Sequence, residues 1–170
     1  GGIYASPSVA GSRPGALVAG AWTVMMSMGQ KGYTECVRSI LSAAKKIAAA
    51  VEAHPKLKLF GSPELSVVAF GASDPSVNTY GIADAMKSRG WNLNLLQFPT
   101  CAHICVTYSN SRNADKFISD MDEAVKEIEA DPQKYKSGSA AMYGMATSIA
   151  DRSMVSDLAF AFLDTCYKVQ

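Results

Sequence analysis

The sequence predicts an α+β fold in which an antiparallel sheet carries helices on one face. Two observations lead to this fold class. After two helical segments, the remaining segments follow the order strand, strand, helix, strand, strand, helix, an order that favours antiparallel pairing. The helical segments repeat apolar residues every three or four positions, whereas several strand segments alternate apolar and polar residues. A chain of 170 residues suits one compact domain with its own core.

The N-terminal segment predicts a loop followed by a buried helix. Residues 1–15 contain four glycines and two prolines, too many for a regular helix or a central strand. Ser12 suits the N-cap position and Pro14 the first turn of a helix over residues 16–28, which ends at Gly29. The many small residues of this helix predict close packing and burial.

Four further segments predict helices. Residues 34–53 carry an apolar stripe at helical spacing, and a proline shortly after them ends the helix. Residues 74–89 begin with Asp-Pro and end before a glycine, and residues 117–128 show another amphipathic stripe. The last helix is predicted over residues 151–167, after a loop. Its expected inward side chains are Met154, Leu158, Ala161, Phe162 and Leu163.

Four short segments between these helices predict the strands. Residues 57–60 and 65–70 are joined by Gly-Ser-Pro-Glu in the manner of a hairpin. Residues 92–98 alternate apolar and polar side chains at first, and residues 103–108 alternate throughout. We expect the core of the folded unit to contain Val37, Ile40, Leu41, Phe70, Leu93, Val106, Phe117 and Met121.

Composition and charge exclude several classes of function. The formal net charge of +1 gives no field that would attract nucleic acid or anionic lipid. Four cysteines without Cys-x-x-Cys spacing and two histidines predict neither a zinc site nor a disulfide framework. Residues 16–28 are too short for a membrane span and no signal-peptide pattern is present, so we expect a soluble segment. Because the chain opens on a glycine pair without methionine, we expect it to be cut from a longer protein.

The glycine-rich segment before the first helix is the best candidate for chemistry. A helix start offers unpaired N–H groups beside the positive end of the helix dipole, and phosphate is a common occupant of such a site. Ser12 adds a hydroxyl and Arg13 a guanidinium that can grip an oxyanion. In the alternative interpretation Ser12 is only an N-cap and Arg13 is solvated. Tyr4 either reaches a ligand or packs with its hydroxyl at the surface.

Other titratable residues have simpler interpretations. His103 lies in an apolar strand pattern, so it either points to the back of the sheet or, as the alternative, acts as a general base. We expect His54, at a helix end, to interact with the helix dipole. The carboxylates of the 117–128 helix and its end are expected on a solvated face, which disfavours a paired acid/base role. These are Asp120, Asp122, Glu123, Glu127 and Glu129.

Four segments resemble the C-terminal portion of sphingosine-1-phosphate lyases, a pyridoxal-phosphate-dependent family of the group II decarboxylase type. They are GGIYASPSVAGSRPG at 1–15, FGSPELSVVAF at 60–70, GWNLNLLQFP at 90–99 and AMYGMATSIADRSMVSDLAFAFLDTCY at 141–167. The last two are characteristic of that family, whereas the Gly-Ser-Arg-Pro step is similar to one found in the related glutamate decarboxylases. The resemblance covers essentially the whole chain.

The resemblance implies the small C-terminal domain of a fold type I pyridoxal-phosphate enzyme, a homodimer with active sites at the subunit interface. It implies that residues 1–33 are an interface loop and connecting helix, and that residues 34–170 form the small domain. Gly11 and Ser12 would contact the cofactor phosphate of the other subunit, and Tyr4 and Arg13 would lie on the substrate side. No metal is implied. The complete enzyme would lie at the cytosolic face of the endoplasmic reticulum.

The family's reaction cleaves a long-chain sphingoid base phosphate by a retro-aldol step into a long-chain aldehyde and phosphoethanolamine. The lysine that holds the cofactor precedes the Gly-Gly-Ile-Tyr loop in this family, and no lysine of this chain stands in that context. We therefore expect no catalytic residue here and an inactive isolated chain. Two alternatives stay open, a fragment of a glutamate-type decarboxylase and a non-catalytic dimerisation remnant.

Overall fold

The computed structural model describes residues 5–8, 11–74, 77–132, 134–135 and 153–168. The chain divides into two compact units. The first, which we call the sheet unit, contains Ser39–Ala150 together with Gly1–Gly2. The second, which we call the helical unit, contains Ile3–Arg38 and Asp151–Gln170. Helix α1 (Gly15–Ala53) belongs in part to each of them.

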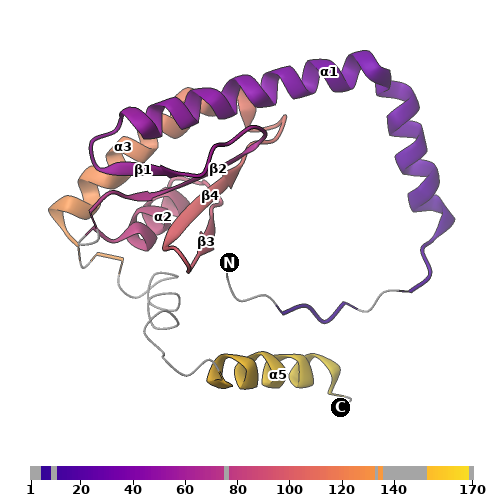
Figure 1. Cartoon of the computed structure of the whole chain (residues 1–170). Helices are drawn as coiled ribbons and strands as arrows, with labels where there is room; N and C mark the ends of the chain where they lie inside the picture. The colour runs from indigo at the N-terminus through magenta and orange to yellow at the C-terminus, as the bar shows by residue number, and fades with distance from the viewer. Residues whose placement is uncertain (1–4, 9–10, 75–76, 133, 136–152, 169–170) are drawn as a thin grey trace. The chain divides into compact units, whose positions relative to one another are not determined.

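The sheet unit contains a four-stranded antiparallel sheet, as predicted (Figure 1). Its strands are β1 (Leu57–Phe60), β2 (Val67–Ala72), β3 (Asn94–Leu96) and β4 (Cys101–Cys105), in the spatial order β1-β2-β4-β3. Every neighbouring pair is antiparallel. The predicted order of strands and helices is therefore confirmed.

Helices α2 (Thr79–Ser88) and α3 (Ala114–Ala130) lie behind the sheet in Figure 1, and a 3-10 turn (Ser111–Asn113) precedes α3. Helix α2 begins later than predicted, because Asn78 supplies the cap. The Asn78 side chain accepts a hydrogen bond from the Gly81 N–H at 3.1 Å.

Strand β4 lies earlier in the chain than predicted, because the backbone turns after Val106. The Val106 N–H still donates to the Ser66 carbonyl at 2.7 Å, in line with the strand pairing. The next N–H, of Thr107, donates instead to the Asn110 side chain at 2.7 Å. An asparagine that bonds to backbone in this way favours a turn over a strand.

The core lies between the sheet and the helices. Phe70 of β2 and Trp91 both meet the ring of Phe117 edge to face, at centroid distances of 6.2 and 5.0 Å. Helix α1 contributes Ile47 and Val51 to the same cluster. Burial is confirmed for Phe70, Val106, Phe117 and Met121, whereas Ile40 and Leu93 are only partly buried against the cluster.

The predicted inward face of the second helix is wrong at its N-terminal end. Val37 is 46% exposed and Leu41 is only half-buried, while the burial on α1 begins at Ala43. The apolar stripe continues along the helix, but the sheet unit begins only at Ser39. The stripe therefore extends beyond the core that it was expected to cover.

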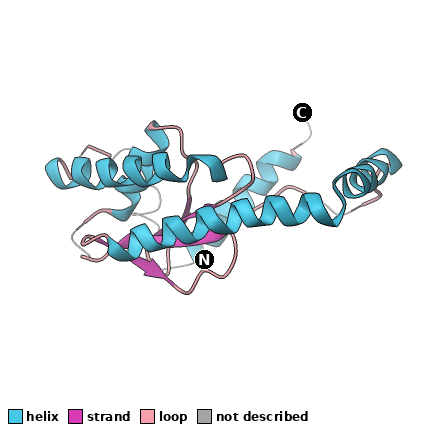
Figure 2. Cartoon of the chain, turned by 90° about the horizontal axis from the view of Figure 1, so that it is seen from above, coloured by secondary structure: helices cyan, strands magenta, loops and turns pink. Residues whose placement is uncertain are grey.

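Helix α1 is bent at Gly29, close to the predicted break. This residue has φ 56° and ψ −174°, values that only glycine adopts without strain. In Figure 2 the segment before Gly29 is seen nearly end-on, while the segment after it lies across the view. Because the helix resumes at once, two predicted helices form one bent helix.

Most large apolar side chains of the helical unit are exposed, contrary to prediction, whereas Leu163 is half-buried. In α1, Leu17, Val18, Trp22, Met25 and Met26 are each more than half exposed. In α5 (Ser153–Tyr167) the same holds for Met154 and Leu158, and Phe162 is 50% exposed. Burial requires a facing surface, and the described residues provide none over these side chains.

Candidate functional site

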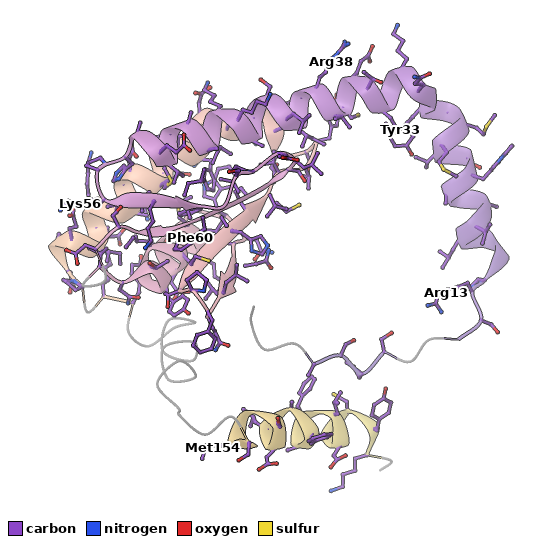
Figure 3. The ribbon with its side chains drawn as sticks, in the orientation of Figure 1. Arg13, Tyr33, Arg38, Lys56, Phe60 and Met154 are labelled. Carbon is purple, nitrogen blue, oxygen red and sulfur yellow. The ribbon has the colours of Figure 1, made fainter. Side chains whose placement is uncertain are left out.

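The candidate phosphate segment precedes α1 as an exposed stretch without regular structure. Gly11, Ser12 and Arg13 are all exposed, and an Arg13 Nη1 atom donates to the Gly11 carbonyl at 2.8 Å (Figure 3). The helix begins at Gly15, where the Leu17 N–H donates to the Pro14 carbonyl at 3.1 Å. Ser12 therefore lies three residues before the first helical residue, and its predicted N-cap role is wrong.

The groups around the start of α1 fit an anion such as a phosphate group. Ser12 and Arg13 contribute hydrogen-bond donors, and the first turn of α1 contains no acidic residue. A Cβ atom placed on Gly11 would meet no atom within 4 Å, so the chain itself leaves space beside this backbone. Tyr4, the other candidate, lies outside the described residues.

His103 lies on the face of the sheet opposite the helices, as one of the two predictions had it. It is half-buried in β4 and stands in register with Ala69 of β2 and Asn94 of β3. His54 lies just after α1, where its Nδ1 accepts from the Lys56 N–H at 3.1 Å. Its Nε2 lies 3.7 Å from an Asp122 carboxylate oxygen. His54 thus stabilises the turn between α1 and the strand that follows it.

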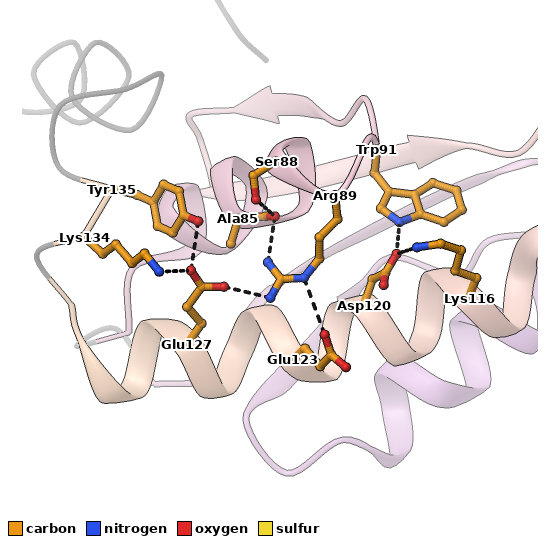
Figure 4. A network of polar contacts seen from close by, with 10 residues as sticks. All are labelled: Ala85, Ser88, Arg89, Trp91, Lys116, Asp120, Glu123, Glu127, Lys134 and Tyr135. Atoms are coloured by element: carbon orange, nitrogen blue, oxygen red, sulfur yellow. Dashed lines mark hydrogen bonds and ion pairs between the residues drawn. The ribbon is translucent and has the colours of Figure 1, made fainter.

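Two carboxylates of α3 are not on a solvated face, which corrects the sequence-based expectation (Figure 4). Asp120 is only 9% exposed and accepts hydrogen bonds from Trp91 Nε1 at 2.5 Å and from Lys116 Nζ at 2.6 Å. Burial by itself would raise the pKa of Asp120, but these two hydrogen bonds outweigh it and lower the pKa. Asp120 is therefore an anion held by its neighbours.

Glu127 forms the second acidic centre and is partly buried. Its carboxylate receives Lys134 Nζ at 2.7 Å, Arg89 Nη2 at 2.8 Å and the Tyr135 hydroxyl at 2.9 Å. The hydrogen bonds from Lys134 and then Arg89 lower the pKa of Glu127 to about 2. The group joins the end of α2 to α3 and to the residues after α3, so it serves structure rather than proton transfer.

Sequence reasoning missed these two centres for identifiable reasons. The spacing of Lys116 and Asp120, four residues apart on one helix, is a visible signal for an ion pair. Arg89 and Glu127 are 38 residues apart, and only the packing of α2 on α3 brings them together. That contact has no local sequence signal.

The comparisons with known proteins point to one family. No protein-family profile matches the chain. The chain is 41% identical over 167 residues to the sphingosine-1-phosphate lyase of Arabidopsis thaliana, a match that covers 98% of this chain and 30% of that protein. The solved sphingosine-1-phosphate lyase of Burkholderia pseudomallei is 37% identical with a TM-score of 0.63, over 74% of this chain and 28% of that one. The chain is a homologue of the sphingosine-1-phosphate lyases.

The match covers only part of each of these lyases. The chain spans about 30% of the length of the curated lyases that it resembles. The tryptophan decarboxylase of Catharanthus roseus, at 16% identity and a TM-score of 0.51, shares the fold over 65% of this chain. The α+β fold class predicted from the sequence is confirmed by the antiparallel sheet and its helices, and these solved structures share the fold. Among the described residues we find no helix whose length and apolar character would let it span a bilayer.

Proposed function

We propose that the chain is the C-terminal portion of a pyridoxal-phosphate-dependent sphingosine-1-phosphate lyase that acts in sphingolipid breakdown. The carrying observation is 41% identity to the Arabidopsis lyase over 98% of the chain. The alternative of a glutamate-type decarboxylase fragment has weaker support, because the likeness to a solved decarboxylase is one of fold. The reaction would break a carbon–carbon bond of a sphingoid base phosphate and give a long-chain aldehyde and phosphoethanolamine.

In this proposal the chain helps to hold the cofactor and contributes no catalytic residue. Pyridoxal phosphate, when bound, supplies the electron sink for the bond cleavage. The Ser12 hydroxyl and the N–H groups beside Gly11 would donate to its phosphate, where the exposed start of α1 offers donors and no carboxylate. Arg13 and Tyr4 would face the phosphate-bearing substrate. Arg13 exchanges its intrachain hydrogen bond to Gly11 for an oxyanion in this role.

The assembly that we propose is a homodimer with this segment at the subunit interface. Support comes from the exposed apolar side chains of the helical unit, such as Trp22 at 60% and Leu158 at 71% exposure. Exposed apolar patches mark interaction sites in soluble proteins. Residues 1–33 would be the interface segment and residues 34–170 the small domain. The complete enzyme would act at the cytosolic face of the endoplasmic reticulum.

The test is an activity assay on the complete polypeptide and on the isolated 170-residue chain, both supplied with pyridoxal phosphate. We expect aldehyde release from sphingosine 1-phosphate by the complete polypeptide and none by the isolated chain. Release of carbon dioxide from glutamate without aldehyde would favour the decarboxylase alternative. Turnover of neither substrate by a folded complete polypeptide would favour the non-catalytic remnant.

A further inference from the structure

A hydrogen bond joins the N-terminal and C-terminal segments of the helical unit. The hydroxyl of Tyr167, the last residue of α5, donates to the Pro7 carbonyl, 160 residues earlier in the chain. Both residues belong to the helical unit. Pro7 lies in the stretch before α1 that also carries Gly11 and Ser12. The contact therefore ties α5 to the segment that holds the candidate phosphate donors.

The backbone around Pro7 has local support for the conformation in which its carbonyl meets Tyr167. The pyrrolidine ring of Pro7 fixes its own φ angle. The Ser6 hydroxyl oxygen accepts a hydrogen bond from the Ser8 N–H at 3.3 Å, a side-chain to backbone bond that is typical of turns. Because this turn bond does not use the Pro7 carbonyl, that carbonyl accepts from Tyr167.

Gly11 and Ser12 lie between two fixed points of the chain. Tyr167 holds Pro7 on one side, and α1 begins at Gly15 on the other. At most about 14 Å of extended backbone separates Gly11 from either point. A stretch that is held at both ends loses less conformational entropy on binding a ligand than one held at a single end.

We propose that Tyr167 is a positioning residue for the cofactor. Its hydroxyl holds the Pro7 carbonyl and so orders the donors of Gly11 and Ser12 before pyridoxal phosphate binds. This inference rests on the proposed function, in which those donors contact the cofactor phosphate. Tyr167 touches neither the cofactor nor the substrate and acts through the backbone of the loop. The helix α5 thereby contributes to a site that lies at the other end of the chain.

The exposure of the contact sets the size of the expected effect. Tyr167 is 54% exposed and Pro7 is exposed, so water competes for both groups. The net contribution of a hydrogen bond between neutral groups corresponds to a change of about two- to tenfold in an equilibrium constant. A direct hydrogen bond to a charged phosphate contributes more. The loss at Tyr167 should therefore be smaller than the loss at Ser12.

The first test is Tyr167→Phe in the complete polypeptide, which removes the hydroxyl and keeps the ring. We expect the dissociation constant of pyridoxal phosphate, measured by absorbance titration, to rise about two- to tenfold. With the cofactor at saturation, kcat should equal that of the parent, because Tyr167 contacts no reacting group. A general loss of folded protein would lower kcat as well, so a lowered kcat with an unchanged dissociation constant would overturn the proposal.

The second test uses the isolated chain and needs no cofactor. Proteinase K cleavage within residues 5–13, followed by mass spectrometry, reports how often this stretch is released. When reclosing is fast, the cleavage rate follows the population of the open form. Tyr167→Phe should therefore raise the rate about two- to tenfold.

The matched control is Tyr33→Phe, which removes another phenol hydroxyl from the same unit. Tyr33 lies on α1 and is 43% exposed, so this variant should match the parent in both tests. Equal dissociation constants for the parent and Tyr167→Phe would overturn the proposal. Weakened binding in Tyr167→Ala with normal binding in Tyr167→Phe would assign the effect to the ring, which also overturns it.

The two tests separate this inference from the proposed function. A complete polypeptide that cleaves the substrate, and whose Tyr167→Phe variant binds the cofactor as the parent does, supports the proposed function and rejects the role of Tyr167. A complete polypeptide that binds no pyridoxal phosphate overturns the proposed function and the cofactor role together. The cleavage rate in the isolated chain still decides whether Tyr167 holds the loop.

Discussion

At the scale of single residues, Glu127 has the most consequential environment in the described chain. Two cations and a tyrosine hydroxyl converge on one carboxylate whose side chain is 19% exposed. Such a group is stable as an anion only because its donors replace the lost water. Stability should therefore depend on the protonation state of this one residue.

We predict that Glu127→Gln reduces the acid sensitivity of the chain. The folded pKa of about 2 lies below the ordinary value of 4.5, so the ionised group stabilises the fold above that value. This contribution is lost as pH falls from about 5 towards 2, because the proton binds the unfolded chain first. The free energy of unfolding, measured with urea between pH 3 and 7, should change less steeply with pH in the variant. The difference in slope should correspond to at most about one proton taken up on unfolding.

The control for this prediction is Glu123→Gln. The Glu123 side chain is 62% exposed and lies 3.7 Å from Arg89, so its loss should change the unfolding free energy by less than about 1 kcal/mol at neutral pH. Equal pH slopes for the parent chain and Glu127→Gln would contradict the assigned role of Glu127.

Ser12 gives the second prediction at this scale. A hydrogen bond to a charged acceptor contributes about 1.5 to 3 kcal/mol, so Ser12→Ala in the complete polypeptide should weaken retention of pyridoxal phosphate roughly 10- to 100-fold. Since α1 begins only at Gly15, the change removes no helix cap and should leave the melting temperature unchanged. Ser8→Ala, in the same exposed segment, is the matched control. Equal cofactor dissociation constants for both variants would remove Ser12 from the site.

At the scale of elements, the two ends of α1 carry apolar side chains in different environments. Its inward-facing residues from Ala43 to Val51 are buried in the core, while residues 15–27 are exposed. Helical periodicity indicates that a face is apolar, but it does not say which part of that face meets the core.

We therefore predict opposite outcomes for two substitutions on this helix. Ile47→Ala should cost about 2 to 5 kcal/mol of unfolding free energy, because Ile47 is 2% exposed among core side chains. Val37→Ala, at a position that is 46% exposed, should cost less than about 0.5 kcal/mol. Chemical denaturation of the isolated chain measures both values. Similar costs would mean that the core extends along α1 beyond Ser39.

At the scale of the whole molecule, the exposed apolar surface of the helical unit should make the isolated chain self-associate. The double variant Leu17→Gln with Trp22→Gln should reduce that association, since both side chains are at least 60% exposed. Its unfolding free energy should stay within about 0.5 kcal/mol of the parent, as for other surface changes. Sedimentation equilibrium measures the association, with Lys31→Gln on the same helix as control. An unchanged association constant would place the contact elsewhere.

Most of the fold of the sheet unit was predictable because its signals are local. Helix periodicity placed α3, the Gly-Ser-Pro-Glu turn placed the β1–β2 hairpin, and Gly29 marked the bend of α1. The boundaries of α2 and β4 were missed because side chains of Asn78 and Asn110 decide them by bonding to nearby backbone.

For the candidate phosphate site, the sequence predicted which hydrogen-bond donors are present but not how they are arranged. The segment with Gly11, Ser12 and Arg13 was found from its composition, and its fit to a phosphate still depends on the experiments above. Its predicted helix cap was wrong, because the position of the first helical hydrogen bond depends on the whole start of α1.

The sequence by itself determined the order of elements, the antiparallel sheet and the membership of this chain among homologues of the lyases. Those properties follow from local periodicity, from the residues at turns and from sequence identity to the lyases. Only the tertiary structure decided which apolar faces are buried and which carboxylates are paired. Burial and ion pairing depend on residues far apart in sequence, as Arg89 and Glu127 are, and the distance between such residues is set by packing alone.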